Sequence, residues 1–195
     1  MKRLFDIICS LLGLIILSPI LIIIAISITL ESKGGVFYKQ LRVGKNNTDF
    51  KIYKFRTMYV GSDKKGLLTI GNKDSRVTKT GVFLRKYKLD ELPQLINVLN
   101  GSMSFVGPRP EVRKYVNYYS KEDLKIFSIK PGITDYASIE FRDEVELLKN
   151  AKDPEELYIN EIMPKKIVLN KKYMNNPTLL TDIKLILKTF ISIIK

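Results

Sequence analysis

The sequence predicts a mixed α/β (α+β) fold with a membrane-associated N-terminus. A run without charged residues extends from Ile7 to Leu30. Residues 49–58 alternate basic and apolar side chains, which is typical of a β-strand with one exposed face. Apolar residues recur at the spacing of an amphipathic helix over residues 92–99 and again over residues 178–195. Together these patterns predict a membrane helix, a small β-hairpin and several amphipathic helices.

The composition limits the chemistry that the chain can perform. Its 195 residues fit one domain, and its net charge of +13 indicates anionic partners such as nucleic acid, lipid headgroups or phosphorylated substrates. Histidine is absent, which excludes a Ser-His-Asp triad and a histidine-based zinc site. Cys9 is the single cysteine, which excludes an intrachain disulfide and a cysteine-rich metal site. Any catalysis must therefore use Asp, Glu, Lys, Arg or Tyr.

The apolar run is long enough to cross a bilayer, because a helix of that length reaches roughly 36 Å at about 1.5 Å per residue. Two features oppose a single spanning helix. Ser18 and Pro19 lie at its centre, where proline bends a helix. Basic residues also flank both ends rather than one end; they are Lys2, Arg3, Lys33, Lys39, Arg42 and Lys45. The residues alone leave two alternatives open, a kinked spanning helix and a helix-break-helix that enters and leaves by one face.

A β-hairpin is expected next, with strands at Val36–Val43 and 49–58 around a turn at Gly44–Asn47. The second strand has a cationic face, which suits either solvent or a phosphate group. That face carries Lys51, Lys54 and Arg56. A loop with a short strand at residues 67–70 is expected to follow.

The remaining elements are predicted from periodicity and from turn residues. In order, we expect a helix over residues 82–87, one or two helices over 111–127, a turn at Lys130–Thr134, a strand at 136–141, a helix from Asp153 that Pro164 interrupts and that resumes to about Met174, and an amphipathic helix over 178–195. The last helix has a lysine-rich polar face, which favours a position in a membrane interface.

The stretch from Leu89 to Pro110 carries the candidate chemistry. Asp90 and Glu91 precede a short amphipathic helix that Asn100-Gly101 should end. Pro93 is tolerated only in a first helical turn, so the helix should start near residues 89–92 with Asp90 as its N-cap. The helix N-terminus would favour the ionised form of both carboxylates.

Neighbouring residues on a helix point about 100° apart, so this pair is poorly suited to act as one clamp. It suits a division of labour in which one carboxylate attacks and the other binds a hard cation such as Mg²⁺. Taken alone, the pair favours a simpler interpretation, with Asp90 as a helix cap and Glu91 as a residue of the first turn.

Several motifs together resemble the small monotopic bacterial phosphoglycosyl transferases, also called bacterial sugar transferases. The motifs are KRLFDII from Lys2, LSP from Leu17, FKIYKFRTM from Phe50, LDELPQLINVLNGSMSFVGPRPE from Leu89 and KPGIT from Lys130. They extend over most of the chain, and the central one is long and specific.

The resemblance implies transfer of a sugar-1-phosphate from a UDP-sugar to a polyprenol phosphate, usually undecaprenyl phosphate, with release of UMP. It implies that Asp90 forms a covalent phosphosugar intermediate and that Glu91 holds Mg²⁺. It implies that Arg85 lies near the polyprenol phosphate and that Arg109 contacts the nucleotide. Two further substrate-binding candidates follow from the KFRTM motif, Lys54 and Arg56.

The resemblance also selects between the two membrane alternatives. Ser18 and Pro19 match the break of a re-entrant helix, which makes residues 1–33 a re-entrant helix-break-helix. Residues 34–195 would then form a catalytic domain with interfacial helices on the cytoplasmic face of the bacterial inner membrane. The implied partners are the UDP-sugar, the polyprenol phosphate and membrane lipid. A homodimer stays open.

The chain departs from the family pattern at two places, and two other functions stay open. Residues 42–44 read Arg-Val-Gly where members often have Arg-Pro-Gly, and residues 135–138 read Asp-Tyr-Ala-Ser where many have Gly-Trp-Ala-Gln. One alternative is a non-catalytic basic membrane adaptor that binds anionic lipid or nucleic acid, although no RNA-binding signature is present and no nucleic acid is expected. The other is a glycosyltransferase that releases UDP, although the sequence has no Asp-x-Asp motif.

Overall fold

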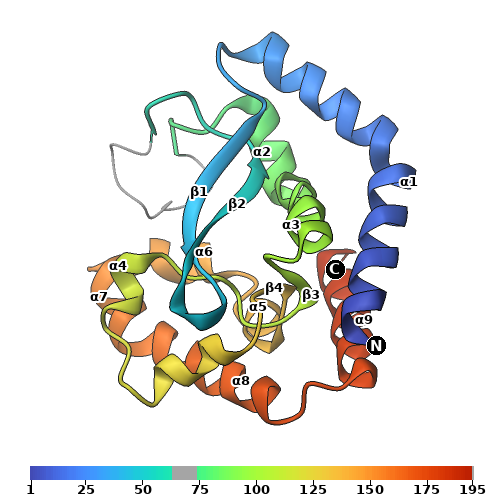
Figure 1. Cartoon of the computed structure of the whole chain (residues 1–195). Helices are drawn as coiled ribbons and strands as arrows, with labels where there is room; N and C mark the ends of the chain where they lie inside the picture. Colours follow the sequence, from blue (N-terminus) through green and yellow to red (C-terminus); the bar gives the residue numbers. More distant parts are fainter. Residues whose placement is uncertain (63–73, 195) are drawn as a thin grey trace.

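The computed structural model describes residues 1–62 and 74–194, and the strand expected at residues 67–70 lies outside them. The N-terminal half contains α1 (Lys2–Glu31), β1 (Phe37–Val43), η1 (Lys45–Asn47), β2 (Asp49–Phe55), α2 (Lys79–Lys86), η3 (Leu89–Glu91) and α3 (Gln94–Asn100). Next come β3 (Ser104–Val106), α4 (Arg113–Val116), η4 (Asp123–Ser128), β4 (Gly132–Thr134) and α5 (Tyr136–Glu140). The chain ends with α6 (Glu144–Lys149), α7 (Pro154–Leu157), η5 (Tyr158–Ile162), α8 (Met163–Asn175) and α9 (Leu179–Ile194). The expected mixed, helix-rich fold with small sheets is confirmed (Figure 1).

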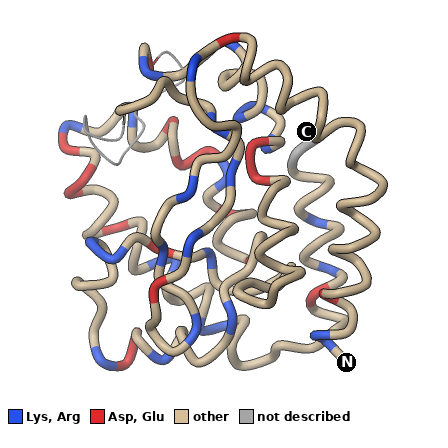
Figure 2. The backbone as a smooth tube through the Cα atoms, turned by 45° about the horizontal axis from the view of Figure 1, so that its top comes forward, with Lys and Arg blue, Asp and Glu red and all other residues tan. Residues whose placement is uncertain are grey.

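α1 is long and apolar enough to cross a membrane by length and composition. It is one continuous helix with Pro19 inside it, so the chain is bent but not broken there (Figure 1). No residue between Asp6 and Glu31 is charged, and Figure 2 shows this part of the tube without charge colours. Many large apolar side chains of α1 are exposed: Leu4, Ile8, Leu11, Leu12, Ile15, Ile16, Ile20, Ile22, Ile23, Ile26 and Leu30.

The first turn of α1 is fixed to the rest of the protein by polar contacts. The Lys2 ammonium donates to the Tyr173 hydroxyl at 2.7 Å and to Asp182 Oδ2 at 2.5 Å. The Arg3 guanidinium donates to the Val98 and Leu99 carbonyls at 2.6 and 2.7 Å, which lie at the end of α3. α3 has its negative dipole end there, so a cation is favoured at that position.

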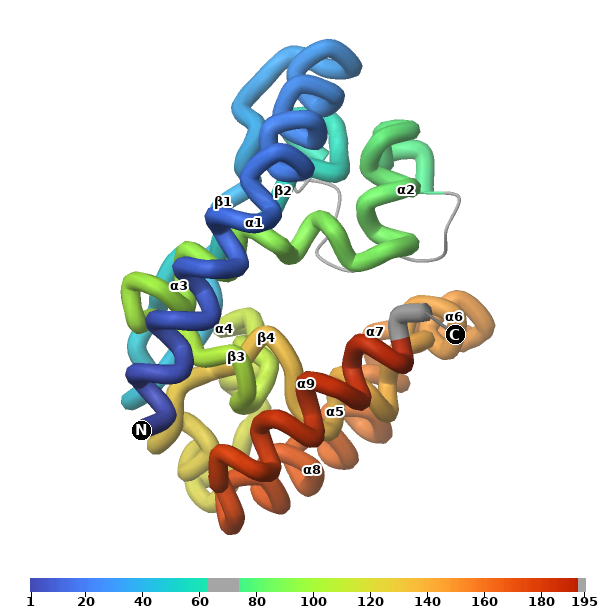
Figure 3. Tube along the Cα trace, turned by 90° about the vertical axis from the view of Figure 1, so that its right-hand side faces the viewer, coloured from blue at the N-terminus to red at the C-terminus, as the bar shows by residue number. Residues whose placement is uncertain are grey.

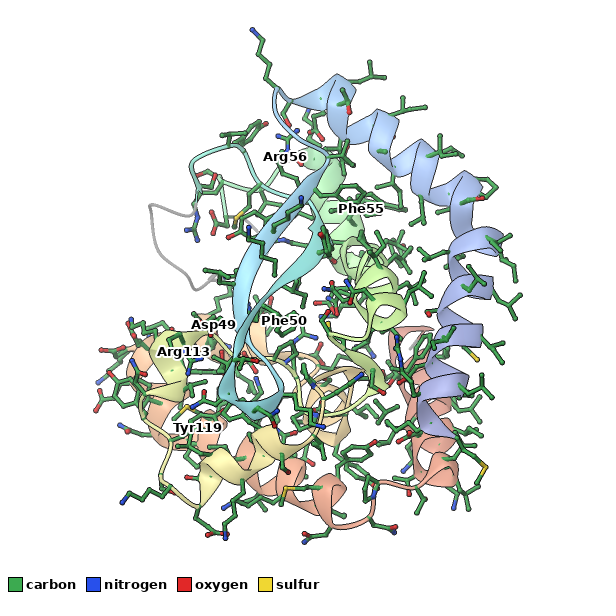
Figure 4. The ribbon with its side chains drawn as sticks, in the orientation of Figure 1. Asp49, Phe50, Phe55, Arg56, Arg113 and Tyr119 are labelled. Carbon is green, nitrogen blue, oxygen red and sulfur yellow. The ribbon has the colours of Figure 1, made fainter. Side chains whose placement is uncertain are left out.

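The last turn of α1 is fixed in a similar way. Glu31 accepts from the backbone N–H groups of Lys79 and Thr80 at 2.6 and 2.9 Å, at the start of α2. Arg56, at the end of β2, donates to Ser32 Oγ at 2.7 Å and to the Gly35 carbonyl at 2.7 Å in the turn after α1. Figure 4 shows Arg56 at this end of the hairpin. Both ends of the apolar helix therefore bind to the same body.

The predicted hairpin is present, with Phe37 opposite Phe55 and Val43 opposite Asp49. Its closed end binds α4 through a 2.6 Å ion pair between Asp49 and Arg113, which lie beside each other in Figure 4. Lys54 lies on β2, which places its side chain near η3. The hairpin thus connects the helical layer at the base of Figure 1 to the candidate site.

A second, parallel sheet was not expected. The prediction of a simple turn at Lys130–Thr134 is wrong, because β4 pairs with β3, with Ser104 opposite Gly132 and Val106 opposite Thr134. The two backbones approach very closely around Gly107 and Gly132. A Cβ on Gly132 would lie 2.1 Å from the Gly107 nitrogen, which only glycine permits.

The strand predicted at residues 136–141 is also wrong, because this segment forms α5. Asp135 caps this helix by accepting from the Ser138 N–H at 2.6 Å. The segment therefore forms a helical turn, although its apolar and polar residues alternate as in a strand. The helix expected from Asp153 is confirmed, with Asp153 capping α7. The interruption predicted at Pro164 is wrong, because the π-helical η5 runs directly into α8 and Pro164 occupies the first turn of α8, where no N–H is needed.

α1 and α9 lie on the same side of the molecule (Figure 3). α9 buries Asp182 and Leu185 against the body. It leaves apolar side chains exposed at Leu179, Leu180, Ile183, Leu187, Phe190 and Ile191. An exposed apolar patch of this extent marks a surface that contacts lipid or another molecule.

We predict that Gly132→Ala destabilises the fold, because the new methyl group would overlap the Gly107 backbone. The cost should be about 1–3 kcal/mol, which would lower the melting temperature by roughly 2–10 °C. Circular dichroism of the detergent-solubilised protein measures it. Gly35→Ala is the matched control, since its Cβ would meet only the Phe37 oxygen at 3.8 Å. Equal melting temperatures for the two variants would contradict the close approach.

Candidate active site

Asp90 and Glu91 lie in η3, a 3-10 turn between α2 and α3, so the prediction of Asp90 as the N-cap of a helix is wrong. Lys88 begins the turn in a left-handed conformation with φ 56°, and Pro93 occupies the cap position of α3. Because proline has no N–H to donate, the residues before it form a 3-10 turn, in which each N–H bonds the carbonyl three residues earlier. One such bond joins the Leu92 N–H to the Leu89 carbonyl at 3.2 Å.

Glu91 is held by two cations that come from distant parts of the chain. Its Oε1 accepts from Lys54 Nζ at 2.8 Å, and Arg109 grips both carboxylate oxygens, with 3.1 Å between Nη1 and Oε2. Burial alone would raise the pKa of Glu91, but the charges and hydrogen bonds of Arg109 and Lys54 hold it well below the usual range. Glu91 is therefore a firmly ionised, immobilised carboxylate.

Asp90 is in a different state from its neighbour. It is 9% exposed, and within the described residues no hydrogen bond reaches its carboxylate. Burial raises the pKa of Asp90; the charge of Lys54 opposes this rise, Glu91 adds to it, and Arg85 and Lys88 also oppose it. The raised pKa contradicts the expectation that a helix N-terminus would favour the ionised form of Asp90. Asp90 is thus a buried carboxylate among cations that accepts no hydrogen bond from the described residues, which suits a nucleophile.

Two predicted arginines occupy different positions around the dyad. Arg85, in α2, donates from Nε to the Thr57 hydroxyl at 2.9 Å and acts on the charge of Asp90. Burial lowers the pKa of Arg85, and Asp90 partly restores it. Arg109 follows β3 and grips Glu91. The charge of Lys54 acts to lower the pKa of both carboxylates.

The other predicted residues are engaged elsewhere. Arg56 donates to Ser32, Lys33 and Gly35 in the turn after α1, which gives it a structural task. Ser18 and Pro19 lie within α1, where the Ser18 hydroxyl donates to the Ile15 carbonyl at 2.8 Å. The structure therefore brings together Asp90, Glu91, Lys54, Arg85 and Arg109 but not these three residues.

Sequence reasoning missed a residue that fixes the backbone of Arg109. Asp135 has no exposed surface, and its Oδ2 accepts from the Arg109 N–H at 3.0 Å while Oδ1 accepts from Ser138. Asp135 stands where many family members have glycine, and that departure was the available signal. It ties the start of α5 to the loop that carries Arg109.

A second missed group lies on the other side of this loop. The Arg42 guanidinium donates to the Pro110 carbonyl at 3.2 Å and lies 3.6 Å from Glu111 Oε1. The Tyr158 hydroxyl donates to Glu111 from η5. Burial lowers the pKa of Arg42, the charge of Glu111 raises it, and Arg109 lowers it further. The segment 109–111 is thus clamped from β1 and from the C-terminal helices.

The donors at this site fit a divalent cation only in part. Among the described residues no group of three or more carboxylates or other usual ligands could hold a metal ion. Mg²⁺ commonly binds through one or two carboxylates together with substrate phosphates and water, and Asp90 and Glu91 offer that number. Because Arg109 and Lys54 already hold Glu91, a cation there would need phosphate oxygens as additional ligands.

Comparison with known proteins identifies the family of the chain. A model of the bacterial sugar transferase family matches residues 1–195. The chain belongs to the bacterial sugar transferase family. An N-acetylgalactosaminephosphotransferase of Aeromonas hydrophila that acts on UDP-N-acetylgalactosamine and undecaprenyl phosphate is 42% identical, over 71% of this chain and 33% of the relative. The UDP-glucose:undecaprenyl-phosphate glucose-1-phosphate transferase of Escherichia coli (strain K12) is 37% identical, over 97% of this chain and 39% of the relative.

A third relative of this bacterial sugar transferase has a similar length. It is the uncharacterized sugar transferase EpsL of Bacillus subtilis (strain 168), 35% identical over 97% of this chain and 85% of the relative. By contrast, the chain spans only about a third to two fifths of the length of the first two relatives. The names of those two specify different sugars, so membership of the family leaves the sugar open.

We predict that Asp135→Ala destabilises the protein by roughly 2–4 kcal/mol, because α5 loses its cap and the Arg109 N–H loses its acceptor. Thermal or denaturant unfolding in detergent measures it. Asp153→Ala is the control, since Asp153 only caps α7 by accepting from Glu155 and Glu156 at 3.0 Å. It should cost about 1 kcal/mol. Equal losses would show that Asp135 does no more than cap its helix.

Proposed function

We propose that this chain transfers a sugar-1-phosphate from a UDP-sugar to undecaprenyl phosphate, releases UMP, and thereby starts the synthesis of a surface glycan or glycoconjugate. The observation that carries the proposal is the contrast between the two adjacent carboxylates. Glu91 is held by Arg109 and Lys54, whereas Asp90 is buried and flanked by cations and accepts no hydrogen bond from residues 1–62 and 74–194. The names of the relatives support the two substrates.

The first half-reaction forms a covalent intermediate on Asp90. A carboxylate oxygen of Asp90 attacks the β-phosphorus of the UDP-sugar, the phosphoanhydride bond breaks, and UMP leaves with the electron pair. An anion must approach an anion in this step, so neighbouring cations are required. Arg109 and Lys54 supply two such charges beside the dyad. We assign to Arg109 the contact with the nucleotide.

The second half-reaction regenerates the carboxylate. An oxygen of undecaprenyl phosphate attacks the phosphorus of the intermediate, the bond to the Asp90 oxygen breaks, and undecaprenyl diphosphate sugar forms. Arg85 acts on the charge of Asp90 and donates to the Thr57 hydroxyl, and we assign to it the contact with the lipid phosphate. Glu91 would hold Mg²⁺ when it is bound, and the ion would neutralise the pyrophosphate charge.

We propose further that α1 is re-entrant, so that the protein is monotopic and lies on the cytoplasmic face of the inner membrane. Lys2 and Arg3 at one end of α1, and Glu31 at the other, bind the same body. Between them Gly13 lies against Leu95 of α3. A helix that crossed the bilayer would carry one end about 30 Å away from that body. The apolar surfaces of α1 and α9 on one side support insertion from one face (Figure 3).

We predict that purified protein with Mg²⁺, undecaprenyl phosphate and an accepted UDP-sugar releases UMP, and that chelation of Mg²⁺ by EDTA stops the release. Asp90→Asn should lower turnover roughly a thousandfold or more, because an amide is not a nucleophile here. A panel of UDP-sugars followed by nucleotide chromatography tests both points.

Asp153→Asn is the matched control, because asparagine also caps a helix and Asp153 bonds only to the first turn of α7 among the described residues. Its turnover should stay close to that of the wild type. Release of UDP in place of UMP would indicate a glycosyltransferase. Full turnover by Asp90→Asn with unchanged circular dichroism would exclude the covalent role.

We also predict that both flanks of α1 face the same compartment. One cysteine inserted after Met1 and another at Lys45→Cys, each in a Cys9→Ala background, should react with a membrane-impermeant maleimide from the same side of sealed vesicles. Vesicles of the opposite orientation provide the control. Labelling from opposite sides would show that α1 spans the membrane.

A further inference from the structure

Basic side chains converge at the end of α3 that is opposite the dyad. A Cβ placed on Gly101, which ends α3, would lie 3.0 Å from Arg3 Nη2 and 3.3 Å from Lys130 Nζ. The two nitrogens are therefore no farther apart than the sum of these distances. Two cations held this close repel each other unless an anion lies between them.

The carbonyls that end α3 stabilise Arg3, but no described carboxylate pairs with either cation. Neither Arg3 nor Lys130 forms an ion pair within residues 1–62 and 74–194, and Arg3 donates only to the backbone carbonyls of Val98 and Leu99. A guanidinium has five N–H donors, so others remain for a ligand. The carboxylate with an electrostatic effect on this pair is that of Asp6. Asp6 is 3% exposed and already accepts hydrogen bonds from Ser104 and Phe105.

The charges around Lys130 agree with this geometry. Burial lowers the pKa of Lys130, and the charge of Arg3 lowers it further. Asp6 acts in the opposite direction but does not compensate, and Lys45 adds to the lowering. A bound anion would remove this mutual repulsion, so the cluster favours a ligand with negative charge.

The surface beside the cluster is apolar. Leu4 follows Arg3 directly and is 63% exposed, and Ile8 and Leu11 continue the exposed surface one and two turns along α1. Water-soluble phosphate would gain nothing from such a surface, whereas acyl chains would cover it. The combination of a cation pair and an adjoining apolar strip matches a lipid with an anionic headgroup.

We propose that Arg3 and Lys130, with added charge from Lys45, bind the phosphate of an anionic phospholipid whose acyl chains lie on the exposed face of α1. The site is separate from the dyad, because η3 and the cluster lie at opposite ends of α3. It would anchor the start of α1 at the membrane surface. The proposal does not depend on the transfer reaction.

Native mass spectrometry of the full chain in detergent, titrated with phosphatidylglycerol or phosphatidylcholine, tests the site. The wild type should retain one phosphatidylglycerol in preference to phosphatidylcholine. Lys130→Gln should weaken its retention about tenfold, as expected for one lost charge-assisted hydrogen bond, and Lys130→Arg should preserve it. Circular dichroism checks that each variant is folded.

Lys152→Gln removes the same charge between α6 and α7, far from the start of α1 in Figures 1 and 3, and should leave retention unchanged. Equal weakening by Lys152→Gln and Lys130→Gln would overturn the proposal, since binding would then follow net charge.

Two competition arms identify the ligand. Displacement of phosphatidylglycerol by undecaprenyl phosphate would mean one site shared with a substrate, and displacement by millimolar inorganic phosphate would mean a site for free phosphate; either result would overturn the proposal. Simultaneous retention of both lipids would support it.

Discussion

The ion cluster around Glu91 is the interaction on which the candidate site depends. One carboxylate receives Lys54 from β2 and Arg109 from the loop after β3, so three distant segments meet at a single buried point. A buried carboxylate is costly unless its oxygens are paired, and here both oxygens are paired. The arrangement also separates the roles of two adjacent acids. Lys54 and Arg109 donate to Glu91, and in the part of the chain that the structure describes no donor bonds the buried Asp90.

Contacts from several elements fix the loop that carries Arg109, just as ion pairs fix the carboxylate that Arg109 binds. Asp135 holds the Arg109 N–H, Arg42 holds the Pro110 carbonyl, and Tyr158 holds Glu111. The close approach of Gly107 and Gly132 brings the two parallel strands together beneath it. A guanidinium can grip a carboxylate with both terminal nitrogens only when its backbone is placed accurately. The parallel sheet and its flanking contacts supply that placement.

Local patterns were sufficient to predict the hairpin, the capping of α7 by Asp153 and the end of α3 at Gly101. Residues 132–134 and 136–140 were mispredicted, because the pairing of β4 with β3 and the cap from Asp135 depend on contacts outside the local pattern. The grouping of Lys54, Arg85 and Arg109 came from motifs, since no periodicity relates residues so far apart. The contacts of Arg42 and Asp135 were not predicted, because they are made to backbone groups and composition does not reveal them.

The attachment of α1 at both ends has a consequence for the dyad. The helix is apolar between Asp6 and Glu31, so on the proposed insertion lipid would determine its depth, and its ends would determine how the body sits beneath it. Arg3 binds the end of α3, and Glu31 binds the start of α2, the two helices that flank η3. The candidate membrane helix is therefore coupled directly to both sides of the turn that carries Asp90 and Glu91. On the proposed insertion, a change in the depth of α1 would move α2 and α3 with it, so the turn that carries Asp90 would keep a fixed position relative to α1.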